Sequence, residues 1–412
     1  MIQMYDSWVQ AADKGELTGV CMLDMSAAFD VVDHDILLDK LKLYGFDEMA
    51  LQWMKDYLSG RTQAVYIDGS LSSFLAVDVG VPQGSILGPL CYVLFTNDMP
   101  ETILETRSHV HWSHLTTHCA ECGSLCCFAD DSTYSVSSQH QDILKQKLDE
   151  RYSVMASYLG NIRLKLNDDK THLLIMTTRQ KRRLININTK INTPEEEIKP
   201  IKSEKLLGIF IQDDLKWTEY LQNNDKSLIK QLTSRLNGLR MIGGIASFKV
   251  RLMIANGIFM SKLIFQISLW GGAEDYLLNS LQVIQNKAAR FVTRRGRYTP
   301  VAELLNQCGW LSVKQLVFYH SVILIHKTIL TTYPKYIFTK LSSQFPYNTR
   351  LAESETVRMG PEFQCKLDLT ERSFMNRATS SYNLLPTEIR KIQKIETFKL
   401  KLKTWVLENC RI

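Results

Sequence analysis

The sequence has no long apolar run that would direct the chain into or across a membrane. Residues 1–6 lack the charged and apolar blocks of a signal peptide. The stretch nearest to a membrane span, 263–273, is well short of the roughly 18 apolar residues that a spanning helix needs. These absences predict an intracellular protein, in the nucleus or the cytoplasm, that is not secreted and has no membrane partner.

The sequence also lacks an even number of cysteines and a strong net charge of either sign. Nine cysteines are an odd number in a chain without a secretion signal, so we expect reduced thiols rather than disulfides. With 49 basic and 43 acidic side chains the net charge is +6, and the pI is about 8.7. This mildly basic balance suits a polyanionic partner but does not require one.

At 412 residues the chain is too long for one compact core, and two or three domains are expected. No internal repeat and no low-complexity tail is visible in the sequence. From Trp217 onward the pattern is helical throughout, with breaks at glycine and proline. This change in pattern predicts a domain boundary near residue 215, and a second boundary is expected near residue 340.

The periodicity of the apolar residues predicts the elements before residue 215. Two strand-like stretches, 62–67 and 74–79, flank Asp68-Gly69-Ser70, which is the signature of a β-hairpin. The segment 80–85 contains too much glycine and proline for a regular element. The other predicted elements are helices at 1–13, 36–45, 48–58, 86–97 and 141–160, and strands at 17–25, 173–177 and 205–211.

Two adjacent acids, Asp130 and Asp131, stand between two strand-like stretches at 125–128 and 132–136. The β-branched and aromatic flanks and the turn-prone Ala-Asp-Asp-Ser predict a β-hairpin with both carboxylates at its tip. Holding two like charges so close has a Coulomb cost, which falls sharply when a divalent cation lies between them. On its own, the pair is better explained as an ordinary polar hairpin tip.

A third carboxylate changes that interpretation. Asp24 ends an apolar strand, so its side chain is expected to project from the edge of a buried sheet. If the hairpin lies beside this strand, Asp24, Asp130 and Asp131 form a cluster that could bind two divalent cations. Two such ions clamp phosphate oxygens during in-line displacement, one activating the attacking hydroxyl and the other stabilising the leaving pyrophosphate.

Three ordered segments then carry a family resemblance. They are Leu23-Asp24-Met25-Ser26-Ala27-Ala28-Phe29-Asp30, Gly80-Val81-Pro82-Gln83-Gly84-Ser85-Ile86-Leu87-Gly88-Pro89 and Phe128-Ala129-Asp130-Asp131. Two shorter pieces follow at 164–171 and 206–210. In this order they resemble the polymerase motifs of reverse transcriptases from non-LTR retrotransposons of the jockey and chicken-repeat type. The resemblance covers about residues 15–215 and extends more loosely over 372–405.

The resemblance implies an α+β fold. Residues 1–215 would form a polymerase palm, an antiparallel sheet packed on helices with a ferredoxin-like core. Residues 216–340 would form a helical thumb, and 341–412 a helical C-terminal segment. The fingers region of such enzymes is largely missing from these 412 residues. No second acidic and histidine set for DNA nicking is visible either, so the sequence predicts a truncated open reading frame.

The implied activity is that of an RNA-directed DNA polymerase, which joins deoxynucleotides (dNTPs) to the 3′-hydroxyl of a DNA or RNA primer on an RNA template. Asp24, Asp130 and Asp131 would be the catalytic residues and would hold two Mg²⁺ ions, with help from the backbone carbonyl of Met25. Lys170 would act near the leaving pyrophosphate, although an ordinary surface lysine is nearly as good an interpretation.

Three further segments receive roles from the same resemblance. Phe29 would lie under the incoming sugar and exclude a 2′-hydroxyl by steric clash, which favours deoxynucleotides. Pro82-Gln83-Gly84 would lie against the template base and the nucleotide, because glycine permits close backbone approach. Leu207-Gly208-Ile209 would form the primer grip, which supports the primer 3′ end. Without the motifs, these segments would be interpreted as a core aromatic, a plain loop and an internal strand.

A basic cluster lies in the helical region. Arg290, Arg294, Arg295 and Arg297 fall within eight residues and are predicted to contact the phosphates of a nucleic acid. A solvated basic face is the ordinary alternative.

A stretch rich in histidine and cysteine, 109–127, precedes the acidic hairpin. Cys119 and Cys122 have zinc-like spacing, but one Cys-x-x-Cys is only half a site. A loop with incidental thiols accounts for the stretch better than zinc does.

Two other functions stay open at this point. The chain could be a catalytically silent remnant that only binds nucleic acid, or an RNA-binding protein similar to intron maturases. The three carboxylates disfavour the silent remnant, and the absence of an upstream RNA-binding region disfavours the maturase.

Overall fold

The computed structural model describes residues 1–104, 111–113, 116–119, 123–184, 189–193, 197–242, 246–342 and 366–410. The chain divides into two compact units. The sheet unit contains Glu16–Met176 and Gln180–Lys202, and the helical unit contains Met1–Gly15, Thr177–Arg179 and Ser203–Ile412. The three domains predicted from the sequence stay a prediction.

The sheet unit is built on seven strands in the order β13-β10-β1-β9-β8-β7-β6. The β10–β13 pair is parallel and the other neighbouring pairs are antiparallel. All seven residues of β1 are buried, which explains why its sequence is a continuous apolar run rather than an alternating one. The strands are β1 Leu17–Leu23, β6 His111–Ser113, β7 Thr116–Cys119, β8 Gly123–Phe128, β9 Asp131–Ser138, β10 His172–Met176 and β13 Pro200–Ile201.

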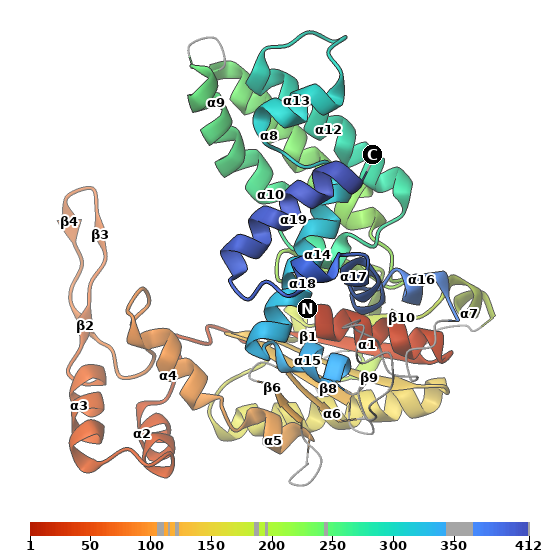
Figure 1. Ribbon diagram of the computed structural model, residues 1–412. Helices are drawn as coiled ribbons and strands as arrows, with labels where there is room; N and C mark the ends of the chain where they lie inside the picture. The colour runs from red at the N-terminus through yellow and green to blue at the C-terminus, as the bar shows by residue number, and fades with distance from the viewer. Residues whose placement is uncertain are drawn as a thin grey trace. The chain divides into compact units, whose positions relative to one another are not determined.

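Helix α6, Gln141–Asn161, packs on this sheet (Figure 1). The helix comes close to the sheet at Gly19 in β1, where an added Cβ would lie 2.7 Å from Cδ1 of Leu148. The Tyr134 hydroxyl in β9 donates a hydrogen bond to the backbone carbonyl of Leu148 at 3.2 Å. These contacts fix the centre of the sheet against the helix and confirm the expectation of a mixed fold in which a sheet packs with helices.

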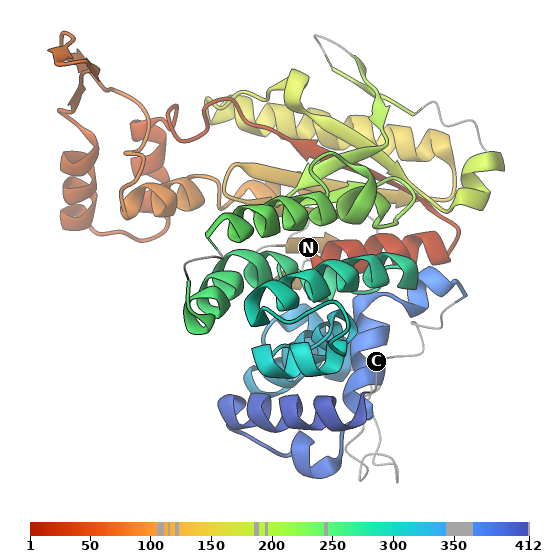
Figure 2. The ribbon, with the colours of Figure 1, turned by 90° about the horizontal axis from the view of Figure 1, so that it is seen from above.

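Between β1 and β6 the sheet unit carries a group of helices and a projecting β-hairpin (Figures 1 and 2). The Asp33 and Asp47 side chains cap α2 and α3 by accepting from backbone N–H groups three residues ahead. Asp68 and Gly69 have φ of 48° and 83° and form the predicted hairpin turn. The elements are α2 His34–Leu43, α3 Glu48–Leu58, β2 Thr62–Gln63, β3 Tyr66–Ile67, β4 Ser70–Leu71, β5 Leu75–Ala76, α4 Leu87–Phe95 and α5 Met99–Leu104.

The helical unit contains the first helix of the chain and the helices that follow residue 215. The Tyr5 hydroxyl donates to the Leu215 carbonyl at 2.5 Å, and the Asp6 carboxylate accepts from the Phe374 N–H at 3.2 Å. These contacts explain why Met1–Gly15 belongs to this unit. The larger helices are α1 Ile2–Asp13, α8 Leu228–Ile242, α9 Phe248–Ile254, α12 Asp275–Thr293, α13 Val301–Cys308, α14 Val313–Thr331, α15 Lys335–Ser342, α17 Phe374–Asn383 and α19 Ile395–Asn409.

Shorter elements complete both units. The sheet unit adds the 3₁₀ turn η1 Asp168–Lys170, β11 Ile191–Asn192 and β12 Glu197–Ile198, and α7 Arg179–Leu184 begins at the unit boundary. The helical unit adds β14 Ser203–Leu206, β15 Ile209–Gln212, the π-helices η2 Glu219–Asn223 and η3 Ala255–Met260, α10 Ser261–Leu263, α11 Ile267–Trp270, α16 Asp368–Glu371 and α18 Thr387–Arg390.

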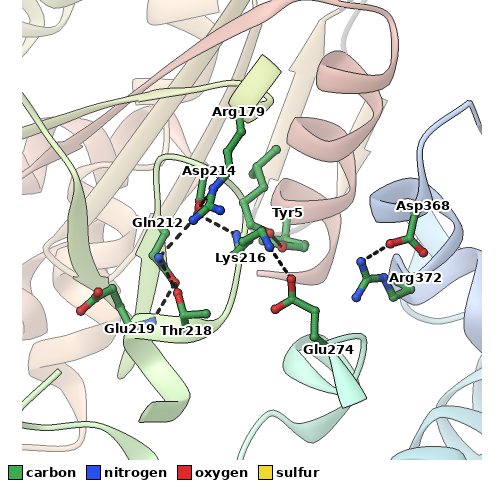
Figure 3. Close-up of polar contacts among 11 residues, drawn as sticks. Tyr5, Arg179, Gln212, Asp214, Lys216, Thr218, Glu219, Glu274, Asp368 and Arg372 are labelled. Atoms are coloured by element: carbon green, nitrogen blue, oxygen red, sulfur yellow. Dashed lines mark hydrogen bonds and ion pairs between the residues drawn. The ribbon is translucent and has the colours of Figure 1, made fainter. Parts of the chain in front are cut away.

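Polar contacts hold the segment that leads from β15 into η2 (Figure 3). The Gln212 side chain accepts from the Glu219 N–H at 2.8 Å and donates to the Thr218 hydroxyl at 3.0 Å. Asp214 accepts from the Lys216 N–H at 3.2 Å and pairs with Arg179 at 3.3 Å. The base of the β14–β15 hairpin is therefore anchored within the helical unit.

Taken one at a time, none of the described helices is long and apolar enough to cross a membrane. One pair, α13 and α14, meets the length and composition requirement together, with a bend of 44° between the two helices.

Candidate active site

The three predicted carboxylates lie at the same end of two neighbouring strands. β1 and β9 pair as far as Leu23 and Ser132, so one further step of this register sets Asp24 beside Asp131. The β8–β9 hairpin closes with Phe128 opposite Asp131. The predicted hairpin is therefore present, and it lies beside the strand that ends in Asp24.

The hairpin tip is a two-residue turn of Ala129 and Asp130, so Asp131 is the first residue of β9. Ala129 has φ of 54°, a left-handed conformation that costs an L-residue other than glycine about 1–2 kcal/mol. Asp130 is half-buried and Asp131 is exposed. The local sequence thus supplies a strained tip with two carboxylates, at the end of β8 and β9 that lies beside Asp24. The strand ends that carry Asp24, Asp130 and Asp131 form the acidic edge of the sheet unit.

The electrostatics of this edge show that the carboxylates influence one another. Burial raises the pKa of Asp131, and the negative charges of Asp130 and Asp24 raise it further. Nζ of Lys170 lies 3.6 Å from Oδ2 of Asp24. Because the Lys170 side chain is 69% exposed, this ion pair is a weak one. The site is therefore rich in negative charge that Lys170 offsets only in part.

Met25 follows Asp24 and bridges to Leu166 on the β10 side of β1. The hydrogen bonds of this bridge use the Asp24 carbonyl, which accepts from Asn167 at 2.9 Å, and the Ser26 N–H, which donates to Lys165 at 3.1 Å. This bridge uses the Asp24 carbonyl, and the role of the Met25 carbonyl as a metal ligand stays a prediction.

The donor chemistry of these residues suits Mg²⁺, but the structure does not gather their carboxylates into a metal site. Within the described ranges, no group of three or more His, Cys, Asp or Glu side chains is close enough to hold a metal ion. Carboxylate and carbonyl oxygens are the ligands that Mg²⁺ prefers. A cation would also offset the repulsion that raises the pKa of Asp131. The residues that would hold it are Asp24, Asp130, Asp131 and the Met25 carbonyl.

The structure joins the segment after Asp24 to the glycine-rich segment 80–85. The Val81 N–H donates to the Phe29 carbonyl at 2.8 Å, and Nε2 of Gln83 donates to Oδ1 of Asp30 at 2.7 Å. Gly80 has φ of 86°, and an added Cβ would lie 2.5 Å from the Asp30 carbonyl oxygen. Only glycine allows this approach.

Pro82 and Gly84 belong to the same turn. The Pro82 carbonyl accepts from the Ser85 hydroxyl at 2.7 Å, and the Ser85 hydroxyl in turn accepts from the Gly88 N–H at 2.9 Å. Gly84 is exposed and has φ of 79°. Phe29 and the Pro82-Gln83-Gly84 segment, predicted separately from the sequence, are thus parts of two segments that hydrogen bonds join within the sheet unit.

Tyr92 in α4 is a site residue that the sequence reasoning missed. Its ring packs on Phe29 with the centroids 4.7 Å apart, and its hydroxyl donates to Sδ of Met25 at 3.1 Å. Burial and the charge of Asp130 raise the pKa of Tyr92, which therefore stays a neutral donor. The sequence signal that could have found it is the single hydroxyl group, that of Tyr92, in the otherwise apolar sequence of α4. Tyr92 therefore contacts both Phe29 and Met25 and helps to fix their side chains.

The predicted primer grip belongs to the helical unit. The prediction of a single strand at 205–211 is wrong, because two strands occupy this segment. The segment is a hairpin in which β14 and β15 pair through Leu206 and Ile209. Leu207 and Gly208 have φ of 47° and 86°, the positive values of a tight two-residue turn. The primer-grip role of Leu207, Gly208 and Ile209 stays a prediction.

The arginine cluster lies at the end of α12. Arg290 is in its last turn, and its Nη2 donates to the Arg297 carbonyl at 3.4 Å. Arg294, Arg295 and Arg297 are exposed. Cations at a helix C-terminus are favoured by the helix dipole. Exposure makes the cluster accessible to phosphates, and the contact itself stays a prediction.

The zinc prediction cannot be placed on the described residues. Cys119 ends β7, but its side chain lies outside them, as does the whole of Cys122. Burial raises the pKa of Cys127 in β8 to about 12, so this thiol stays protonated.

Comparison with known proteins decides the family. The model of the family "Reverse transcriptase (RNA-dependent DNA polymerase)" matches residues 3–210, just over half of the 412 residues. The chain belongs to this family. The resemblance to reverse transcriptases of non-LTR elements is confirmed by relatives of that kind among the curated proteins.

One relative is the "Probable RNA-directed DNA polymerase from transposon BS" of Drosophila melanogaster, 28% identical over 289 residues, which cover 69% of this chain and 30% of that protein. Another is the "RNA-directed DNA polymerase from mobile element jockey" of Drosophila funebris, 27% identical over 287 residues, which cover 69% of this chain and 29% of that protein. This chain of the reverse transcriptase family thus aligns with less than a third of each relative.

Among solved structures, telomerase from Candida albicans in complex with a fragment of telomeric RNA overlaps 81% of this chain and 52% of that chain. The TM-score is 0.40 and the sequence identity is 10%, so this likeness carries no argument about the chain.

Proposed function

We propose that this chain is an RNA-directed DNA polymerase of non-LTR retrotransposon origin. It would join dNTPs to the 3′-hydroxyl of a DNA or RNA primer on an RNA template. The observation that supports this most directly is the placement of Asp24, Asp130 and Asp131 at one edge of a buried sheet. Membership of the reverse transcriptase family gives that acidic edge its chemistry.

Asp24, Asp130, Asp131 and the Met25 carbonyl would hold Mg²⁺ at this edge. When bound, Mg²⁺ supplies electrophilic activation of the primer hydroxyl and of the phosphate oxygens. Lys170, next to Asp24, would offer a proton or a positive charge to the leaving pyrophosphate. The strained Ala129 turn holds the two hairpin carboxylates in position before substrate arrives.

Phe29 would select the sugar. Its ring is packed on Tyr92, and its backbone is held by the hydrogen bond from Val81, so it cannot move aside at low cost. A fixed aromatic edge beneath the sugar would clash with a 2′-hydroxyl and would offer it no acceptor. The sheet unit would then act as the palm of the polymerase and the helical unit as its thumb, with the β14–β15 hairpin as the primer grip.

A second candidate is a protein that binds nucleic acid without polymerising it. The exposed arginines after α12 suit phosphates, and in the described part of the chain the three carboxylates are not gathered into a closed metal site. This candidate predicts binding of RNA by the chain with no incorporation of nucleotides.

The test is primer extension by the full chain on an RNA template with Mg²⁺. The Asp130→Asn/Asp131→Asn variant removes two charges from the acidic edge. The matched control, Asp39→Asn/Asp68→Asn, removes two charges from positions away from that edge in the same unit, and asparagine tolerates the positive φ of residue 68.

We expect extension by the wild type and the control, and a loss of at least about 1,000-fold in the active-site variant. Equal incorporation by wild type and active-site variant would contradict the polymerase proposal. Binding of RNA by all three proteins without any incorporation would favour the second candidate.

A further inference from the structure

The glycine-rich segment 80–85 begins with backbone hydrogen bonds to the segment 29–34. The Gly80 N–H donates to the Val32 carbonyl at 2.8 Å. Nε2 of His34 donates to the Gly80 carbonyl at 2.8 Å, because a carbonyl oxygen can only accept. Both backbone polar groups of Gly80 are therefore used, and the start of the glycine-rich segment is fixed.

The far end of this segment is fixed by Ser85. Its hydroxyl accepts from the Tyr57 hydroxyl at 2.9 Å, in addition to its contacts with Pro82 and Gly88. Tyr57 belongs to α3, so a helix supports the turn from outside. Gln83 thus lies in a turn that is anchored at both ends, and its remaining freedom is mainly that of its side chain.

One contact orients the Gln83 side chain. Its Nε2 donates to Oδ1 of Asp30 at 2.7 Å. Among the residues that the structure describes, Asp30 is the only partner of this amide group. An ionised carboxylate only accepts hydrogen bonds, so the amide turns its NH₂ group toward Asp30 and directs its carbonyl oxygen, Oε1, elsewhere. Because both side chains are exposed, Oε1 is an acceptor that a ligand can reach.

We propose that Asp30 is a positioning residue, which fixes the Gln83 amide so that Oε1 accepts a hydrogen bond from the incoming nucleotide. The inference rests on the proposed function and on the predicted contact of Gln83 with the nucleotide. A free glutamine amide offers a ligand either its NH₂ group or its carbonyl, whereas the amide held by Asp30 offers the carbonyl. Asp30 would thus decide that Gln83 recognises a donor group of the nucleotide, without touching the nucleotide itself.

The test measures dNTP binding by the full chain with Mg²⁺, on an RNA template and a primer that ends in a dideoxynucleotide. This primer lacks the 3′-hydroxyl, so binding is measured without incorporation. Asp30→Asn keeps the size of the side chain but can donate as well as accept, so it no longer holds the Gln83 amide in one orientation. The control, Asp39→Asn, makes the same change at an exposed position of α2.

We expect Asp30→Asn to raise the Kd for dNTP about 5-fold, the effect of losing one hydrogen bond of ordinary net strength. The control should change the Kd by less than about 2-fold. In extension of an ordinary primer, Asp30→Asn should raise KM by a similar factor and leave kcat within about 2-fold of the wild type, because only a binding group is misoriented. An unchanged Kd and KM in Asp30→Asn would overturn the proposal.

Two double variants separate positioning from a purely structural role. If Asp30 acts only through Gln83, Asp30→Asn/Gln83→Met should bind dNTP as weakly as Gln83→Met does, and no more weakly. The swapped pair Asp30→Asn/Gln83→Glu again sets an amide donor against a carboxylate and again offers an acceptor at position 83. It should therefore bind dNTP more tightly than Gln83→Glu, which opposes two carboxylates. An additional loss in the first double variant, or no recovery in the swapped pair, would contradict the proposal.

The choice of dNTP shows which donor Oε1 accepts from. The sugar 3′-hydroxyl is common to all four dNTPs, so an equal loss for all four in Asp30→Asn supports a contact with the sugar, and a loss confined to one of them supports a contact with the base. If the wild type binds no dNTP on the blocked primer, the proposed function fails and this inference fails with it. If the wild type binds dNTP and Asp30→Asn binds it equally well, only the role of Asp30 is refuted.

Discussion

The acidic edge predicts that Asp131→Asn makes the metal-free chain more stable while it abolishes primer extension. Asp131 is placed beside Asp24 by the β1–β9 register and follows Asp130 directly. Burial raises its pKa, and the charges of Asp130 and Asp24 raise it further. Carboxylates about 5 Å apart repel by between about 0.8 kcal/mol in water and about 3 kcal/mol near a protein surface. Because Asp131 is exposed, solvent screening favours the lower end, and we expect a gain of about 1 kcal/mol.

The effect has a definite dependence on pH. A raised pKa means that the folded chain binds more protons than the unfolded chain just above the ordinary carboxyl pKa of about 3.9. The stability of the wild type therefore falls as the pH rises through the raised pKa of Asp131. The advantage of Asp131→Asn should be present at pH 7.5 and should shrink as the pH is lowered toward 4, because protonation of the wild-type carboxyl group removes the repelling charge.

Urea denaturation of the full chain in EDTA, at both pH values, measures this difference. Adding Mg²⁺ at pH 7.5 should stabilise the wild type more than Asp131→Asn, because the ion binds the folded carboxylates. Asp39→Asn, a change on α2 away from the acidic edge, should alter the unfolding free energy by less than about 0.5 kcal/mol. If Asp131→Asn lowers stability at pH 7.5, the carboxylates do not repel one another as argued, and the case for a cation between them loses its physical basis.

Two further predictions concern the segments that the structure joins. Phe29→Ala should raise the ratio of ribonucleotide to deoxynucleotide incorporation, whereas Tyr92→Phe, which keeps the supporting ring, should not; an unchanged ratio in Phe29→Ala would remove Phe29 from sugar selection. Gly80→Ala should destabilise the chain by at least about 2 kcal/mol in urea, because its Cβ would meet the Asp30 carbonyl at 2.5 Å. Gly69→Ala, with a similar positive φ but open space around it, should cost only about 1 kcal/mol, and equal losses at both positions would refute the close approach.

The parts of the site that follow from local pattern could be predicted from the sequence. The apolar run before Asp24 and the turn-prone residues around Asp130 specify a strand end and a hairpin tip, because these depend on a few neighbouring residues. The β-hairpin at 62–76 and helices α2, α3 and α6 were predictable for the same reason. The pattern alone did not predict that the strand ending in Asp24 lies beside the Asp130-Asp131 hairpin. That expectation came from the family resemblance.

Contacts between distant segments could not be predicted in this way. Tyr5 and Leu215 are 210 residues apart, and nothing in either segment indicates that the first helix belongs with the second half of the chain. The approach of Gly80 to Asp30 depends on the path of the whole chain segment between them, residues 31–79. Leu207 lies in an apolar run beside the strand formers Ile209 and Phe210, yet it takes φ of 47° because a turn is required there. The local pattern therefore predicted one strand where two occur.

The acidic edge also predicts which ligand protects which protein from urea. Burial and the charges of Asp130 and Asp24 raise the pKa of Asp131, and the exposed Lys170 offsets this negative charge only weakly. A ligand that binds only the folded chain stabilises it by an amount set by its concentration relative to Kd. Mg²⁺ should therefore protect the wild type and lose its protective effect in Asp131→Asn, whereas RNA in EDTA should protect both proteins. If RNA also lost its protective effect in Asp131→Asn, the substitution would disturb more than the binding of a cation, and the loss of protection by Mg²⁺ could not be assigned to the acidic edge.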